Sequence, residues 1–215
     1  MSSSLKQPKE NNKMSDVKGA RTKAPETFEF TKEHKDEVKV ILSRYPKDRG
    51  TSAVMPLLDM AQRQSGGWLP PAAIEHVAEI LHMAPIRVYE VASFYSMYNL
   101  NPVGKYHIQV CGTTPCMLSG AEDIVKACES HLGITLGETT ADGKFTLTEV
   151  ECLGACVSAP MIQINDDYYT DLTPEICVKL LKDLGDDKEV SVGSQTGRQG
   201  ACPSTGPTTL KSKGA

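Results

Sequence analysis

Residues 106–116 read YHIQVCGTTPC, and residues 145–156 read FTLTEVECLGAC. Each stretch begins with an alternation of apolar and polar residues, which predicts a β-strand, and each ends in a short loop that carries two cysteines. Four residues separate Cys111 from Cys116, and three separate Cys152 from Cys156. If the two strands are neighbours in one sheet, both loops project from the same end of that sheet and the four thiolates converge.

Four converging cysteines form the ligand set of a 2Fe–2S cluster. Gly112 and Gly154 suit such a site, because glycine lets the backbone curl until amide N–H groups point at sulfur. A helix expected after the first loop would place the positive end of its dipole near the anionic centre. We therefore predict one 2Fe–2S cluster. Its candidate ligands are Cys111, Cys116, Cys152 and Cys156.

Other interpretations of the cysteines compete with the cluster. Structural zinc also takes four cysteines, but its ligands usually stand two residues apart in short knuckles. A redox dithiol of the thioredoxin type needs a C-x-x-C motif, which this sequence lacks. Four unrelated core cysteines would rarely fall in two matched strand–loop pairs. The spacing also differs from that of plant-type ferredoxins, so we expect another ferredoxin class.

The remaining cysteines are interpreted as structural. Cys128 and Cys177 fall on the apolar faces of predicted helices, where small buried thiols are common. Cys202 lies in the C-terminal tail and has no expected role. His107 stands four residues before Cys111, which is about 13 Å along a strand, so the two cannot share a metal.

The chain divides into four segments. Residues 1–27 have few large apolar side chains and are expected to be disordered. Residues 28–102 carry apolar residues at helical spacing, which predicts a helical bundle. Residues 103–184 mix strands and helices and predict a small α/β domain. Residues 185–215 are rich in Gly, Ser and Thr, and we expect this tail to order only on another protein.

Within the α/β segment the pattern predicts individual elements. The two cysteine-bearing strands are expected to end at Cys111 and at Cys152. A helix is expected over residues 121–132, and a hairpin over residues 161–170. A last helix, with Thr173 as its N-cap, should run to about residue 184.

Composition excludes several functions. The formal net charge of −4 offers no basic surface for nucleic acid. No run of 18 apolar residues occurs, so we expect no insertion into a membrane. No glycine-rich dinucleotide or phosphate motif is present, so we expect neither NADH nor FMN to bind this chain. An electron carrier without a complete catalytic site of its own fits these observations.

Three stretches resemble a known family: residues 88–95 (VYEVASFY), residues 104–111 (GKYHIQVC) and residues 149–160 (EVECLGACVSAP). Together they are similar to the flavoprotein 2 family of NADH dehydrogenase subunits in respiratory complex I. The likeness covers roughly residues 28–184. Related subunits that serve NAD-linked hydrogenases and formate dehydrogenases are the alternative within the same fold, and a zinc-stabilised adaptor is the alternative from another class.

The resemblance implies an N-terminal helical bundle followed by a thioredoxin-like ferredoxin domain. It implies a 2Fe–2S cluster on the four candidate cysteines that exchanges electrons with FMN on a partner flavoprotein, which also binds NADH. It further implies contact with the large iron–sulfur subunit of the peripheral arm. The implied location is the matrix side of the mitochondrial inner membrane, although residues 1–27 hold no clear transit peptide, since acidic Glu10 and Asp16 interrupt the basic character.

Charge around the second cysteine loop leads to one further hypothesis. Glu149 and Glu151 precede Cys152, and no Lys or Arg occurs between Lys144 and Lys179. Because reduction adds negative charge to the cluster, we expect a low potential, near or below that of plant-type ferredoxins. We expect a Glu151→Gln change to raise it.

Overall fold

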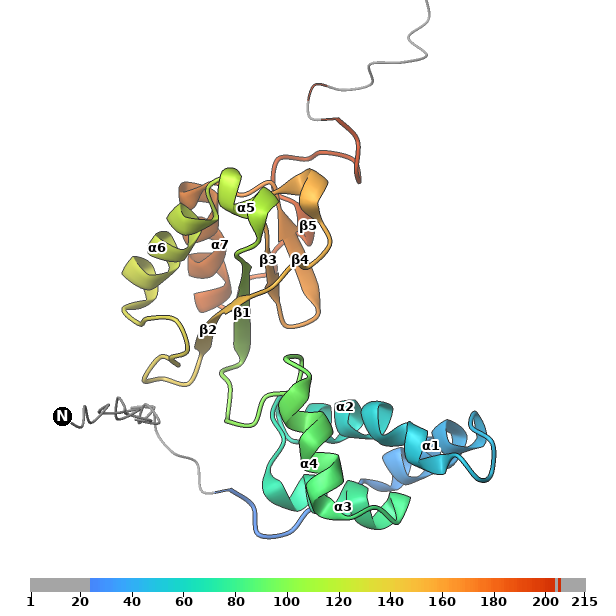
Figure 1. Cartoon of the computed structure of the whole chain (residues 1–215). Coiled ribbons are helices and arrows are strands. Elements are labelled where there is room, and N and C mark those ends of the chain that lie inside the picture. The colour runs from blue at the N-terminus through green and yellow to red at the C-terminus, as the bar shows by residue number, and fades with distance from the viewer. Residues whose placement is uncertain (1–23, 204, 206–215) are drawn as a thin grey trace, which may run out of the picture.

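The computed structural model describes residues 24–203 and 205. In this part of the chain a bundle of helices is followed by a mixed sheet that carries its own helices (Figure 1). The α/β class and the order of the two parts agree with the sequence prediction. None of the helices among the described residues has the length and apolar character needed to cross a bilayer.

The bundle contains α1 (Lys32–Ser43), α2 (Val54–Gln64), α3 (Pro71–Leu81) and α4 (Pro85–Phe94), with a short 3-10 helix at Gly50–Ala53 before α2. Its core consists of the apolar positions that recur at helical spacing, among them Leu57, Leu58, Val77 and Val88, which are fully buried. The prolines that open α3 and α4 occupy first-turn positions, where a missing N–H costs nothing.

The sheet has five strands in the order β2-β1-β3-β4-β5. The strands are β1 (Tyr106–Cys111), β2 (Phe145–Val150), β3 (Ile162–Ile164), β4 (Asp167–Thr170) and β5 (Gly193–Ser194). β1 runs parallel to β2, and β4 runs parallel to β5, whereas β1 with β3 and β3 with β4 are antiparallel. The predicted hairpin over residues 161–170 is therefore confirmed as β3 and β4.

The two faces of this sheet differ. α6 (Ala121–Leu132) and α7 (Pro174–Gly185) pack on the face that carries Ile108, Val110 and Leu147, and all share one buried core (Figure 1). Both helices agree with the predicted ranges, and the Thr173 side chain accepts a hydrogen bond from the Ile176 N–H as its predicted N-cap role requires. The opposite face carries polar side chains and borders a groove of about 770 Å³ shared with the bundle.

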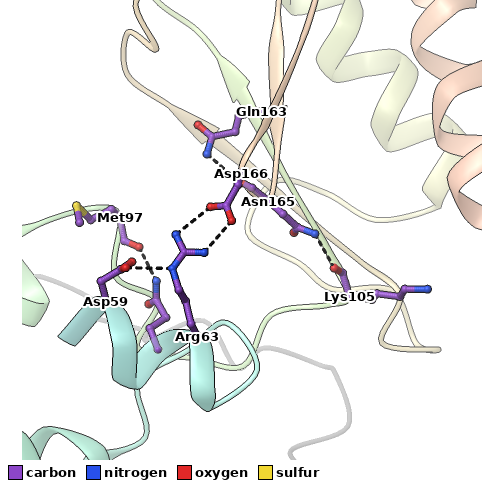
Figure 2. Close-up of polar contacts among 8 residues, drawn as sticks. Asp59, Arg63, Met97, Lys105, Gln163, Asn165 and Asp166 are labelled. Carbon is purple, nitrogen blue, oxygen red and sulfur yellow. Dashed lines mark hydrogen bonds and ion pairs between the residues drawn. The ribbon is translucent and has the colours of Figure 1, made fainter. Parts of the chain in front are cut away.

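An ion pair connects the bundle to the sheet across this groove. Arg63 on α2 donates two hydrogen bonds to Asp166, from Nη1 to Oδ2 over 2.7 Å and from Nη2 to Oδ1 over 3.1 Å (Figure 2). Arg63 Nε also donates to Asp59 Oδ2 over 3.0 Å. On the sheet side, Asn165 Nδ2 donates to the Lys105 carbonyl over 3.0 Å and so ties the hairpin turn to the strand entry. Hydrogen bonding with Arg63 lowers the pKa of the Asp166 carboxyl.

The C-terminal tail differs from the expectation. Residues 185–203 pack on the chain's own sheet without a second protein. Within them, Gly193–Ser194 forms β5 at the edge of the sheet beside β4. Arg198 pairs with Asp171, and their side chains are only 11% and 12% exposed. A two-residue strand of Gly and Ser has no alternating apolar pattern, so sequence periodicity gave no sign of it. Residue 204, residues 206–215 and residues 1–23, for which disorder was predicted, lie outside the described residues.

Candidate iron–sulfur centre

Two neighbouring parallel strands deliver the cysteine loops to one end of the sheet. β1 pairs with β2 so that Cys111 lies opposite Val150, as the convergence of the loops requires. Cys111 is the last residue of β1, as predicted. The second strand is shorter than predicted: β2 ends at Val150, and Cys152 stands in the loop two residues later. The chain leaves the ladder there, and Glu151 and Cys152 are both exposed.

The first loop also differs from the prediction. Cys116 does not precede a helix but lies inside a short one, α5 (Thr114–Leu118), whose first turn contains Pro115. α6, the longer helix, begins only at Ala121. The first residue of α6, Ala121, packs in one buried cluster with Cys111 and Cys116, so the prediction that a helix start lies near the site stays open. α5 turns the Cys116 side chain inward, where it is 1% exposed.

The four candidate ligands meet as two pairs. Cys111 and Cys116, the inner pair, are both buried and interact through their side chains. Cys152 and Cys156, the outer pair, are both exposed, with their Sγ atoms 3.7 Å apart. Cys156 opens the 3-10 helix Cys156–Ser158. The two pairs are close enough that charge on Cys111 affects the pKa of both outer thiols.

The pKa values of the two inner cysteines are shifted in opposite directions. Burial alone would raise the pKa of Cys111, but hydrogen bonds from the Thr113 hydroxyl and from the Leu153 and Thr113 N–H groups lower it. Burial raises the pKa of Cys116 to about 11, and its hydrogen bond to Cys111 acts in the same direction. Cys111 is thus the inner sulfur better prepared to carry negative charge.

The outer pair shows the same split. The Gly154 N–H, then Cys156 and Thr113, lower the pKa of Cys152 by hydrogen bonding to its sulfur. Gly154 has a φ of +82°, a conformation that suits glycine, and its N–H reaches sulfur as the sequence predicted. The pKa of Cys156 is raised, first because its thiol hydrogen bonds to Cys152. Each pair therefore offers one sulfur that is stabilised as an anion.

This arrangement fits a two-iron centre better than a single ion. In a 2Fe–2S cluster each iron takes only two cysteines, and sulfide supplies its other ligands. Two separate pairs of cysteines are therefore the arrangement expected for such a cluster. Structural zinc would need four donors around one point.

The other cysteines and His107 lie away from this centre. Cys128 on α6 and Cys177 on α7 are fully buried, and their Sγ atoms are 3.5 Å apart in the core. Their burial was predicted, whereas their contact was not, because they come from separate helices. The Cys202 carbonyl accepts a hydrogen bond from Arg198. His107 Nε2 lies 3.0 Å from Thr148 Oγ1, and burial lowers the pKa of the ring.

Sequence reasoning missed three features around the site. Thr113 Oγ1 lies 3.5 Å from Cys111 Sγ. The Glu149 side chain covers Gly112 so closely that a Cβ on Gly112 would collide with it. Apolar side chains next to the cysteines are exposed, and only their position two or fewer residues from a candidate ligand could have drawn attention to them. These side chains are Met117, Leu118 and Val157.

Comparison with known proteins adds the family context. Residues 38–185 match the model of the thioredoxin-like [2Fe-2S] ferredoxin family. The chain is 54% identical over 183 residues to a Dictyostelium discoideum protein named NADH dehydrogenase [ubiquinone] flavoprotein 2, mitochondrial, and the match covers 85% of this chain and 74% of that protein. It is 59% identical over 160 residues to an NADH-quinone oxidoreductase subunit of Rickettsia felis, and this match covers 74% of this chain and 96% of that protein.

Solved structures show the same fold at greater distance. The chain superposes on an NAD+-reducing [NiFe]-hydrogenase in the H2-reduced state with a TM-score of 0.55 and 21% identity. The match covers 62% of this chain but only 23% of the hydrogenase chain. At this identity the likeness shows the fold alone.

Proposed function

The chain belongs to the thioredoxin-like [2Fe-2S] ferredoxin family, and from that premise we propose that it is the electron-transfer subunit of an NADH dehydrogenase of the complex I type. In this role it carries one 2Fe–2S cluster on Cys111, Cys116, Cys152 and Cys156. It exchanges single electrons with FMN on a partner flavoprotein subunit, which also holds the NADH site.

The observation that carries the proposal is the meeting of two cysteine pairs at one end of a parallel strand pair. When bound, the cluster supplies a centre that accepts and donates one electron at a time. The cysteines hold it, and the amides of Leu153 and Gly154 stabilise negative charge on sulfur. Tyr168 donates a hydrogen bond to the Leu153 carbonyl over 2.8 Å, which fixes the loop that presents those amides.

The surroundings of the outer pair support transfer to a docked partner. Val157, which follows exposed Cys156, is 65% exposed, and Leu118, two residues after Cys116, is 78% exposed, so each cysteine loop carries exposed apolar surface. A partner that covers these side chains would remove water from the space between its redox group and the cluster. Reduction by NADH therefore depends on the partner, and this chain acts as a subunit of the enzyme.

The names of the close relatives favour the respiratory complex over a hydrogenase. The relative at 54% identity is named as an NADH dehydrogenase flavoprotein and the one at 59% as an NADH-quinone oxidoreductase subunit, whereas the hydrogenase shares 21%. We propose on the same ground that the chain lies in the peripheral arm on the matrix side of the mitochondrial inner membrane. There it contacts the flavoprotein and the large iron–sulfur subunit.

Spectroscopy on the anaerobically purified full chain tests the proposal. We expect visible absorption, two irons and two acid-labile sulfides per chain, and an EPR signal after chemical reduction. NADH should reduce the centre only when the flavoprotein partner is added. A colourless protein that binds zinc would instead establish the adaptor alternative. Stoichiometric FMN binding by the isolated chain would contradict the proposal that FMN binds only the partner subunit.

A further inference from the structure

Thr113 stands at an N-cap position but does not act as a cap. Its backbone is extended, with φ −75° and ψ 166°, directly before α5, yet its side chain accepts no hydrogen bond from that helix. The matching threonines at the starts of α1 and α7 do cap, since Thr31 accepts from the His34 N–H and Thr173 from the Ile176 N–H. The Thr113 hydroxyl is therefore directed to another partner.

That partner is cysteine sulfur. Thr113 Oγ1 lies 3.5 Å from Cys111 Sγ of the inner pair. The Thr113 side chain therefore contacts the inner sulfur whose pKa is lowered, and the Leu153 and Thr113 N–H groups also hydrogen bond to that sulfur.

The direction of this hydrogen bond follows from the chemistry of the loaded site. A cysteine that binds iron has lost its proton, so its sulfur can only accept, and the hydroxyl must donate. One-electron reduction increases the negative charge that the sulfurs share. A donor aimed at them therefore stabilises the reduced state more than the oxidised state.

We propose that Thr113 is a positioning residue that raises the reduction potential of the cluster by donating a hydrogen bond from its hydroxyl to the sulfur of Cys111. This inference rests on the proposed function, because it presupposes the cluster. It assigns a role to a residue that is not a ligand.

The test is a set of single variants of the full chain, each loaded with its cluster and titrated under EPR. Thr113→Val keeps the shape of the side chain and removes the donor, and Thr113→Ser keeps the donor. Thr114→Val is the matched control, because Thr114 is the exposed neighbouring threonine, at the first position of α5. We expect Thr113→Val to lower the equilibrium constant for reduction about threefold to tenfold, where tenfold corresponds to about 59 mV for a one-electron couple. Thr113→Ser and Thr114→Val should keep the wild-type potential.

Iron and sulfide content separates this inference from the proposed function. If the wild-type chain holds no 2Fe–2S cluster, the proposed function itself fails. If every variant holds a full cluster and Thr113→Val has the wild-type potential, the cluster stands and the role of Thr113 is refuted. Loss of the cluster from both Thr113→Val and Thr113→Ala, with retention in Thr113→Ser, would also refute it. The hydroxyl would then hold the loop together and would not tune the potential.

Discussion

The Glu149 carboxylate lies against the Cα of Gly112, in the loop between the two inner cysteines. Glu149 is on β2 and Gly112 follows β1, so the parallel pairing of these strands brings them together. A carboxylate held at this place contributes negative charge next to the cluster loop. The acidic residue singled out from the sequence was Glu151, which instead borders the groove beside Cys152.

We expect Glu149→Gln to raise the reduction potential, because it removes a charge that opposes reduction. For a separation on the order of 8 Å and an effective dielectric of about 20 to 80, one unit charge changes the free energy of reduction by about 0.5 to 2 kcal/mol. This corresponds to about 20 to 90 mV for one electron. Glu151→Gln should also raise the reduction potential. EPR titration of both variants shows which substitution shifts the potential more.

Gly112→Ala provides the control for Glu149. A Cβ on Gly112 would displace the carboxylate, which belongs to an exposed and flexible side chain. The potential should therefore rise as in Glu149→Gln, and the double variant should show no further rise. Additive shifts would mean that the two residues act independently.

Replacing a candidate ligand should remove the cluster. Alanine at Cys111, Cys116, Cys152 or Cys156 is expected to abolish or severely reduce iron and sulfide content, because an iron is left with one protein thiolate. Alanine at Cys128, Cys177 or Cys202 should leave the content unchanged. The variants at buried Cys128 and Cys177 should still lose about 1 kcal/mol of stability. A full cluster in Cys152→Ala would contradict the ligand assignment.

The ion pair between α2 and the β3–β4 hairpin is expected to fix the orientation of the bundle relative to the sheet and to add little to the free energy of unfolding. The side chains of Arg63 and Asp166 are 57% and 70% exposed, so the pair should contribute about 0 to 1 kcal/mol. Arg63→Ala should broaden the distance distribution between spin labels on the bundle and on the sheet. Lys39→Ala, which removes an exposed pair within α1, is the control and should leave the distribution unchanged.

Acid should weaken the contact between the end of α7 and the entries of β1 and β2. Hydrogen bonds from Lys105 and Lys144 lower the pKa of Asp187 to about 2. A carboxyl with a lowered folded-state pKa stabilises the fold above its ordinary pKa of about 4, and this contribution is lost as the pH falls towards 2. In urea unfolding at pH 6, Asp187→Asn should be less stable than wild type. At pH 2 the two proteins should converge, and a constant difference would exclude this linkage.

Arg198 is expected to hold the tail to the sheet. Its removal leaves the Asp171 carboxylate unpaired at a site that is only 12% exposed, which is costly. We expect Arg198→Ala to accelerate amide exchange at Gln195, whose N–H donates to the Thr170 carbonyl over 3.0 Å. Adding Asp171→Asn should restore part of the protection, because no charge is then left unpaired. Fast exchange at Gln195 in the wild-type free chain would mean that this edge strand is not stable on its own.

Much of the fold could be predicted because its elements leave local signals. The alternation before Cys111 and the helical spacing around Val77 each extend over only a few residues. They identified β1 and α3, respectively. What could not be predicted depends on contacts between distant parts of the chain. The packing of Cys128 against Cys177, the cover of Gly112 by Glu149 and the pairing of Gly193 with Tyr169 all join segments that no local period relates.

The candidate site shows the same division. The spacing of the cysteines was enough to name the candidate ligands, since it required only that two strands be adjacent. The sequence could not tell that Thr113 makes no cap, because threonine before a helix normally predicts one. Nor could it tell that the inner cysteines are buried and the outer ones exposed, which depends on where α5 folds back.

The two cysteine pairs differ in exposure, and this difference has a consequence for the order in which their sulfurs meet iron and oxidants. In the free chain, we expect iron delivered from solution to meet the exposed Cys152 and Cys156 before Cys111 and Cys116, which are 2% and 1% exposed. We therefore expect loading to begin at the exposed pair and to end at the buried pair. Peroxide and other oxidants would arrive by the same route, so we expect Cys152 and Cys156 to be the first of the four sulfurs oxidised in an unloaded chain.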